Sequence, residues 1–202
     1  MAKIAIVTGA SRGIGRAIAR RLAADGFAVV VNYAGNLAKA EEVVNEIKSA
    51  GGNALAVQGN IALESDVKRL FDTTLKEFGQ IDVVVNNAGI MAPRKRRLSI
   101  DGYEAQSEAN VLGHFALTAR LMPALVRAAQ GAALAPRVVT LASIAHKRGR
   151  IRFEDLQWKR DYSPMDAYAQ TKLADLIFAL ELERRLKIAP APASGVESLA
   201  AH

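Results

Sequence analysis

The chain has 202 residues, a length that suits a single domain around one sizeable hydrophobic core. Half of its residues are hydrophobic and 23% are charged, as in ordinary globular proteins, and the lack of cysteine excludes disulfides, thiol catalysis and thiolate metal sites. The formal net charge of +7 is compatible with solvated basic loops, with nucleic-acid binding, or with a field that attracts an anionic cofactor.

Short apolar runs alternate with amphipathic stretches along the whole chain, which is the pattern of βαβ units around a parallel sheet. The apolar runs predict strands over 4–8, 27–32, 54–58, 81–85, 137–141 and 195–201. The amphipathic stretches predict helices over 13–24, 37–49, 66–78, 110–129 and 166–186. We therefore expect one doubly wound, Rossmann-type α/β domain of three αβα layers over residues 1–202, with Pro123 kinking the fourth helix.

The first predicted strand runs directly into a glycine-rich turn, and its apolar run is too short for a signal peptide or a membrane span. We expect a cytoplasmic protein without a membrane partner. The turn reads Thr8-Gly9-Ala10-Ser11-Arg12-Gly13-Ile14-Gly15. Such a turn either serves only to reverse the chain or lets the backbone and a helix N-terminus approach the pyrophosphate of a dinucleotide. Its place between a strand and a helix favours the dinucleotide.

The end of the second predicted strand bears on the choice between NAD and NADP. An acidic side chain there would hold the ribose 2′-hydroxyl of NAD, but this chain has Asn32 and Tyr33, with no carboxylate. Arg12 either pairs with the extra phosphate of NADP or is an exposed loop charge. The sequence favours NADP(H).

Tyr168 and Lys172 lie four residues apart on a predicted helix and therefore share one face. A free phenol has a pKa near ~10, and a nearby ammonium favours the phenolate. Ser143 follows the fifth predicted strand, at the edge where open α/β sheets bind ligands, and its hydroxyl can donate to a substrate carbonyl. Asn110 begins the preceding long helix, either to hold a water in a proton path or as a helix N-cap.

With these residues assembled, the chain resembles the short-chain dehydrogenase/reductase family over essentially its full length. The resemblance implies that Tyr168 is the acid/base, that Lys172 binds the nicotinamide ribose and favours the phenolate, that Ser143 orients the carbonyl, and that Asn110 completes a proton relay. The remaining cofactor contacts that it implies come from the glycine turn and from the ends of strands: Gly9, Ser11, Arg12, Gly13, Ile14, Gly15, Asn32, Tyr33, Asn60, Ile61, Asn86, Ala88 and Gly89. The family usually has Asp at position 60, where this chain has Asn60.

The two halves resemble different branches of the family. Residues up to about 90 are similar to classical bacterial reductases of the ketoacyl type, whereas residues 101–104, 110–115, 153–156, 172–175 and 181–186 are similar to retinol-dehydrogenase and WW-domain-oxidoreductase-like members. After residue 202 the family normally continues with Pro-Gly, a substrate-closing segment and a last strand. We therefore expect a C-terminally truncated domain with a poorly held nicotinamide end and an unprotected sixth strand.

Two functions remain open at this point. One is an NADP(H)-dependent oxidoreductase that interconverts a small apolar carbonyl and an alcohol, and the alternative is a non-catalytic NADP(H)-binding protein of the same fold. Basic clusters at 94–97 and 146–152 are read as solvated loops, because stacking aromatics are sparse, and no nucleic-acid partner or metal site is expected. A homo-oligomer through the two long helices is possible.

Overall fold

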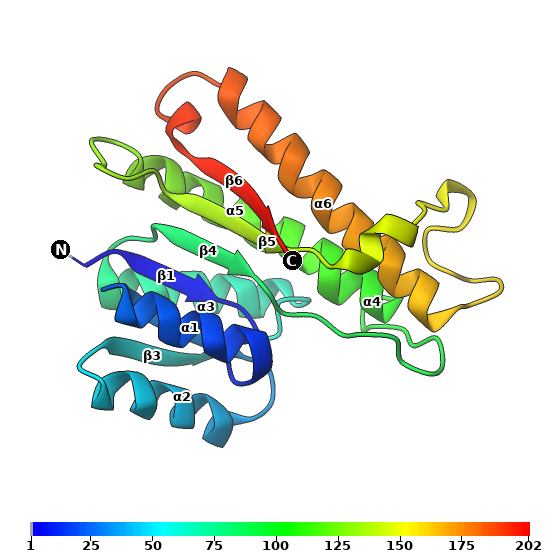
Figure 1. Ribbon diagram of the computed structural model, residues 1–202, viewed down its shortest axis with the longest axis horizontal. Helices are drawn as coiled ribbons and strands as arrows, with labels where there is room; N and C mark the ends of the chain where they lie inside the picture. The colour runs from blue at the N-terminus through cyan, green and yellow to red at the C-terminus, as the bar shows by residue number, and fades with distance from the viewer. Residues whose placement is uncertain (1) are drawn as a thin grey trace.

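The computed structural model describes residues 2–202, which form six parallel strands in the order β3-β2-β1-β4-β5-β6 (Figure 1). The strands are β1 (Ile4–Val7), β2 (Ala28–Tyr33), β3 (Asn53–Gln58), β4 (Val83–Asn86), β5 (Arg137–Leu141) and β6 (Glu197–Ala201). Every residue of β1, β2 and β4 is buried, as expected for strands that are covered on both faces. The predicted doubly wound sheet is confirmed.

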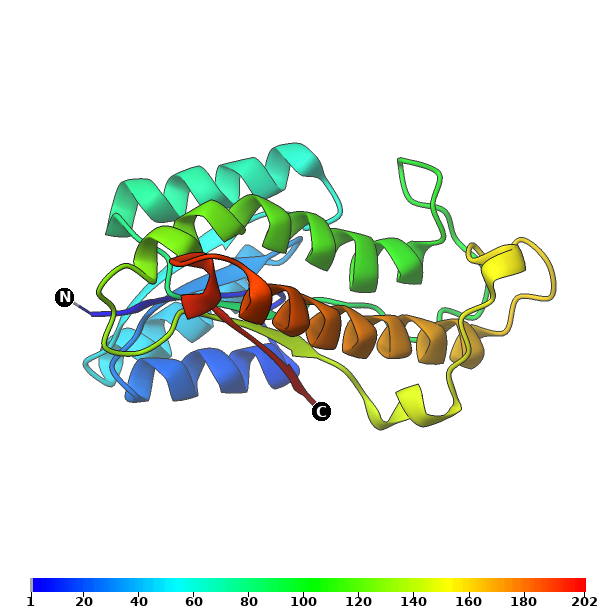
Figure 2. The same cartoon turned by 90° about the horizontal axis from the view of Figure 1, so that it is seen from above.

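Helices cover both faces of the sheet, with α1 and α2 on one side and α3, α5 and α6 on the other (Figure 2). The helices are α1 (Gly13–Ala24), α2 (Leu37–Ser49), α3 (Glu64–Phe78), the short α4 (Ala105–Ser107), α5 (Gly113–Ala128) and α6 (Pro164–Ile188). Alternate strand residues point to opposite faces, so Ile6 and Val30 join the core under α3 and α5, whereas Val29 and Val31 join the core under α1 and α2. The three layers of the prediction are present.

The long helical stretch before β5 begins earlier than the pattern predicts. Its first residue is Ala105, because the Glu104 carboxylate accepts the N–H of Ser107 at 2.8 Å and caps the start. A π-helical turn, Glu108–Leu112, then leads into α5. The expectation that Asn110 begins this helix, and its alternative as an N-cap, are therefore wrong. Pro123 lies inside α5, which continues to Ala128.

The combined stretch Ala105–Ala128 is long and apolar enough to cross a membrane by length and composition alone. Its inward side chains, however, pack against the sheet, with Leu117 and Leu121 completely buried in the core beneath α5. His114, in the same stretch, is also completely buried. These are the contacts of a core helix in a layered domain.

Candidate functional site

The glycine turn after β1 packs tightly against the loop after β4. Gly9 has a φ of +62°, and a Cβ added to it would lie 2.9 Å from the Cα of Ala88. A Cβ on Gly15 would lie 2.5 Å from the side-chain nitrogen of Asn87 and 2.5 Å from the carbonyl oxygen of Gly9. Gly13 faces open space but has a φ of +56°, which L side chains rarely adopt. Backbone geometry therefore requires all three glycines.

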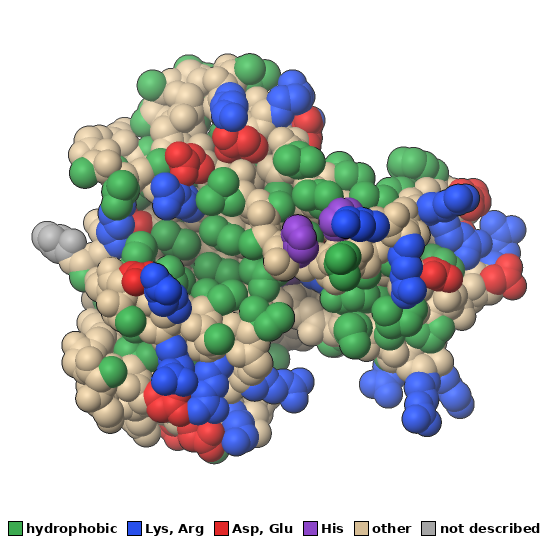
Figure 3. Space-filling model, viewed as in Figure 1, with side chains coloured by type: hydrophobic (Ala, Val, Ile, Leu, Met, Phe, Trp, Pro, Cys, Tyr) green, Lys and Arg blue, Asp and Glu red, His purple; other side chains and the backbone are tan. Residues whose placement is uncertain are grey.

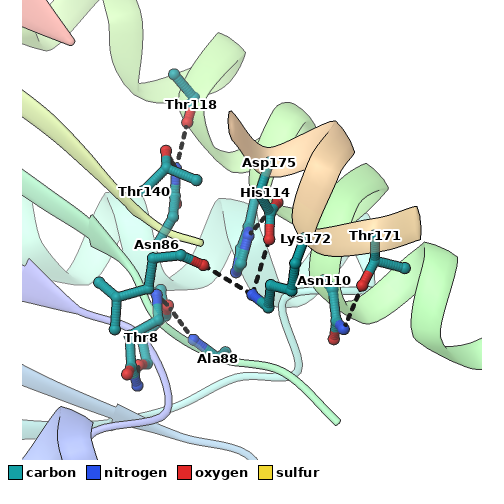
Figure 4. A network of polar contacts seen from close by, with 12 residues as sticks. Thr8, Asn86, Ala88, Asn110, His114, Thr118, Thr140, Thr171, Lys172 and Asp175 are labelled. Atoms are coloured by element: carbon teal, nitrogen blue, oxygen red, sulfur yellow. Dashed lines mark hydrogen bonds and ion pairs between the residues drawn. The ribbon is translucent and has the colours of Figure 1, made fainter. Parts of the chain in front are cut away.

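Thr8 and Asn87 lock this turn to the end of β4. The Thr8 hydroxyl donates to the carbonyl of Val85 at 3.0 Å and accepts the N–H groups of Asn87 and Ala88, both at 2.9 Å (Figure 4). The Asn87 amide in turn donates to the Thr8 carbonyl at 2.7 Å. Both residues belong to motifs that the sequence displays, but their task of joining two loops appears only in the structure.

The N-terminus of α1 opens directly from the turn. No side chain caps it, and the first intrahelical-type bond there runs from the N–H of Arg16 to the carbonyl of Arg12. The N–H groups that precede it in the first helical turn are free to bind an anion. Arg12 is exposed and, within residues 2–202, forms no ion pair, which leaves its guanidinium available beside these groups. Turn, helix terminus and cation together fit the phosphates of a dinucleotide.

The two residues at the end of β2 are used for packing. Asn32 is 1% exposed; its amide nitrogen donates to the carbonyls of Val57 and Gly59, and its oxygen accepts the N–H of Gly9 at 3.4 Å. Tyr33 lies in the core beneath α1 and α2. The end of β2 carries no carboxylate, but the side chains of Asn32 and Tyr33 both point into the protein.

The other predicted cofactor residues differ in exposure, and Ser11 and Ala88 are half-buried. Asn60 and Gly89 are exposed at the ends of β3 and β4. Ile61 and Asn86 are buried: Ile61 packs in the core, and Asn86 donates to Thr118 at 3.0 Å (Figure 4). A buried side chain leaves only backbone atoms for a cofactor contact.

Asn110 ties the loop after β4 to α6. Its amide nitrogen donates to the carbonyl of Ile90 and to the hydroxyl of Thr171, each at 3.0 Å, and its oxygen accepts the N–H of Ile90 at 2.9 Å. The same oxygen lies 2.8 Å from where a Cβ on Gly89 would stand, so Gly89 permits this close approach. The position of Asn110 is thus fixed by partners that are distant in sequence.

Ser143 and Tyr168 line one apolar pocket together with Ile14 of α1. The pocket has a volume of about 660 Å³ and lies in the hollow at the middle of the face shown in Figure 3. Its walls are the α1 face, side chains along β4 and β5, and the C-terminal end of β6. Both Ser143 and Tyr168 are half-buried, and no residue from 2 to 202 hydrogen-bonds the Tyr168 hydroxyl. Two predicted catalytic side chains and the glycine turn therefore meet at one cavity of ligand size.

Lys172 lies beside Tyr168, and hydrogen bonds to other residues hold its ammonium group. Its ammonium nitrogen lies 6.0 Å from the centre of the Tyr168 ring. It donates to the carbonyl of Leu141 at 2.7 Å and to the Asp175 carboxylate at 2.8 Å (Figure 4). Asp175 is 1% exposed and also faces the Nδ1 atom of His114 at 3.5 Å. Sequence reasoning assigned no role to Asp175 or His114, although Asp175 stands at helical spacing from Lys172.

Comparison with known proteins places this site in a family. The model of the short chain dehydrogenase family matches residues 3–154. The chain belongs to the short-chain dehydrogenase family. The predicted resemblance is confirmed at the level of the family.

The relatives of this family member are oxidoreductases. The chain is 43% identical over 187 residues to polyprenol dehydrogenase of Mus musculus, covering 91% of this chain and 55% of that protein. It is 42% identical over 149 residues to the 3-oxoacyl-[acyl-carrier-protein] reductase of Synechocystis sp., covering 73% of this chain and 58% of that one. The chain thus spans little more than half the length of the curated relatives that it matches.

Solved structures of the family share the fold. An uncharacterised protein of Mycobacterium paratuberculosis is 40% identical with a TM-score of 0.82, over 99% of this chain and 67% of that one. The promiscuous reductase LugOII, which catalyses keto-reduction at C1 during lugdunomycin biosynthesis, is 29% identical with a TM-score of 0.74, over 98% of this chain and 75% of that one. The arrangement of strands and helices is therefore that of the family.

Proposed function

We propose that this protein is an NADP(H)-dependent oxidoreductase that interconverts a small apolar carbonyl compound and its alcohol. The observation that carries the proposal is the shared pocket, in which Tyr168 and Ser143 face a cavity that reaches Ile14 of the glycine-turn helix. The names of the relatives, a polyprenol dehydrogenase and a ketoacyl reductase, support the same class of reaction.

The cofactor would be held mainly by backbone. Gly9, Gly13 and Gly15 let the pyrophosphate approach the first turn of α1, whose uncapped N–H groups favour negative charge. Arg12 is the candidate partner of the 2′-phosphate, because it is exposed, unpaired among residues 2–202, and not opposed by a carboxylate at the end of β2. Ser11, Ala88 and the exposed Asn60 follow strands at the carboxyl edge of the sheet and would contact the cofactor there.

The proton chemistry rests on side chains of this chain. Bound nicotinamide supplies or accepts the hydride. Tyr168 donates a proton to the carbonyl oxygen in reduction and removes it from the hydroxyl in oxidation, while the Ser143 hydroxyl donates to the same oxygen and orients it. Lys172 holds positive charge beside the phenol, at 6.0 Å from its ring. Asn110 fixes the loop next to this group through Ile90.

The pocket as a whole is apolar, since its walls include Val and Leu side chains of β4 and β5 and Ile and Leu side chains of α1. We therefore propose apolar aldehydes, ketones or alcohols as substrates. The exposed apolar residues Phe115, Ile177 and Leu180 on α5 and α6 support a homo-oligomer through these helices. A cytoplasmic location and the absence of a nucleic-acid partner stay predictions from the sequence.

The test is hydride transfer from NADPH to a panel of apolar aldehydes and ketones, followed by absorbance. We expect turnover in the unmodified chain and its loss in Tyr168→Phe, with Tyr103→Phe, an exposed tyrosine, as the matched control. NADPH fluorescence titration of the same variants should show unchanged binding. Turnover that persists in the Tyr168→Phe variant would show that Tyr168 is not the acid/base.

The alternative is a cofactor-binding protein without turnover. It predicts saturable NADPH binding in every variant and no substrate-dependent oxidation. Arg12→Gln separates the two cofactors in either case, because it should weaken NADPH binding by about tenfold while leaving NADH binding unchanged. Equal loss for both cofactors would show that Arg12 does not select the 2′-phosphate.

A further inference from the structure

Three arginines that follow β5 line a second pocket, distinct from the one described above. Arg148, Arg150 and Arg152 surround it together with Trp158 and Asp166, and its volume is about 290 Å³. None of these residues lines the pocket of Ser143 and Tyr168. Figure 3 shows Lys and Arg side chains gathered around the end of the molecule that these loops form.

The three arginines stand at every second position and line the same pocket. Arg148 ends a 3-10 helix, Ile144–Arg148, and Gly149 after it has extended backbone angles, φ −66° and ψ 145°. Ile151, between two of the arginines, lines a different pocket that also includes Leu156 and Ala174. The segment thus presents guanidinium groups on one side and an apolar side chain on the other.

The arginine segment is anchored to the catalytic helix. The N–H of Arg152 donates to the side-chain oxygen of Gln170 at 3.0 Å. Gly149 packs so closely that a Cβ on it would lie 2.5 Å from the carbonyl oxygen of Ala169. The segment is consequently fixed in place, and the directions of its side chains are set by the fold.

Trp158 forms the floor of the cationic pocket. The Arg152 guanidinium lies 4.4 Å from the centre of its ring. The indole is 5% exposed, and its N–H has no hydrogen-bond acceptor among residues 2–202. Trp158 also has a φ of +50°, which is unusual for a bulky residue and shows that the surrounding loop forces it into this position.

Positive charge in this pocket is not balanced. Within the described residues, Arg148 and Arg150 form no ion pair, and Arg152 has only a long contact of 3.7 Å to Glu154. The one acidic lining residue, Asp166, already accepts a hydrogen bond from the Ser163 hydroxyl at 2.7 Å. A single arginine satisfies a carboxylate, whereas three converging guanidinium groups match the charge and the several oxygens of a phosphate group.

We propose that Arg148, Arg150 and Arg152, above Trp158, form a binding site for a phosphate group. The group belongs either to a soluble phosphate ester or to a phospholipid headgroup, which share the same chemistry. The site is independent of the proposed oxidoreductase function, since it uses none of the residues of the catalytic pocket.

The chain offers a direct reporter, because Trp158 is its only tryptophan. Trp158 fluorescence is titrated, without any nicotinamide cofactor and at constant ionic strength, with inorganic phosphate and glycerol 3-phosphate. Sedimentation with phosphatidylcholine vesicles, with and without phosphatidic acid, forms the second arm. We expect a saturable change in emission with the soluble ligands, or cosedimentation only with vesicles that contain phosphatidic acid.

The variant R148Q/R150Q should weaken this binding by at least about tenfold, because each guanidinium supplies charged hydrogen bonds. The matched control is R94Q/K95Q, which removes the same charge from an exposed loop of the same end of the molecule and should leave binding unchanged. Equal thermal unfolding midpoints verify that both variants fold. Absence of binding in both arms, or equal weakening in the two variants, would overturn the proposal.

Discussion

The candidate site has a nucleotide half, around the glycine turn after β1, and a catalytic half, around Tyr168 and Lys172. The polar side chains of the two halves differ in their hydrogen-bond partners. In the nucleotide half, Thr8, Asn32 and Asn87 bond to backbone atoms of neighbouring loops. In the catalytic half, the Asp175 carboxylate is held by the side chains of Lys172 and His114, Lys172 donates also to the Leu141 carbonyl, and the Tyr168 hydroxyl has no partner among residues 2–202. Contacts to backbone fix the shape of a loop before any ligand arrives, whereas side chains that hold one another are free to exchange partners when a ligand binds.

The largest effect is expected where the catalytic half depends on a single buried ion pair. Asp175→Ala leaves the Lys172 ammonium buried without its carboxylate, and we expect a loss of about 4 kcal/mol in the free energy of unfolding, measured by urea denaturation. Lys172 and Asp175 are 7% and 1% exposed as side chains, so solvent offers little compensation. This loss would exceed that of any single polar contact in the nucleotide half.

A double-mutant cycle shows whether that loss belongs to the pair. Lys172→Met combined with Asp175→Ala should recover most of the stability, because both charges are then gone. Additive losses in the double variant would mean that the two residues stabilise the fold separately, and the contrast between the halves would fail.

In the nucleotide half, close packing of backbone is the more sensitive feature. Gly15→Ala places a methyl group 2.5 Å from both the Asn87 side chain and the Gly9 carbonyl, and we expect a loss of about 3 kcal/mol, since over-packing against backbone is hard to relieve. Gly35→Ala is the matched control, because a Cβ there meets nothing within 4 Å. Thermal unfolding and NADPH titration of both variants provide the measurement. A Gly15→Ala variant that keeps full stability would show that the turn relaxes.

The sequence predicts much more of the nucleotide half than of the catalytic half. Val-rich runs such as Ala28–Tyr33 are recognisable because strands covered on both faces are apolar throughout, and the glycine turn is local in sequence. The start of the long helix at Ala105 is hidden by buried polar residues, including Glu104 and Gln106, which break its apolar pattern. The contact between His114 and Asp175 joins two helices 61 residues apart, and no local pattern encodes it.

A smaller loss in the free energy of unfolding is expected when the hydroxyl that joins the two loops of the nucleotide half is removed. Thr8→Val removes the acceptor of the N–H groups of Asn87 and Ala88, and we expect a cost of about 2 kcal/mol for these unsatisfied donors. Thr140→Val is the control, because the Thr140 hydroxyl accepts only a long 3.5 Å contact from Asn86. Urea denaturation measures both. Equal losses in the two variants would contradict the view that backbone-directed contacts hold this half.

The mildest effect is expected in a loop outside both halves of the site, the loop that carries Trp158. Here the Asp155 carboxylate accepts the N–H groups of Lys159 and Arg160, each at 2.9 Å, so this loop is held as the nucleotide half is held. These hydrogen bonds, that of Arg160 first, keep the pKa of Asp155 below its ordinary value of 3.8. A lowered pKa in the folded state means that the stabilisation is present above the ordinary value and is lost as the pH falls through the lowered one. Trp158 emission should therefore stay constant from neutral pH to about pH 4 and change only below it.

Asp155→Asn should shift the emission already at pH 7, whereas Asp161→Asn, which changes the same charge at an exposed position of the loop, should not. If Asp155→Asn kept the unmodified emission at pH 7, the loop would be held by its packing rather than by the carboxylate.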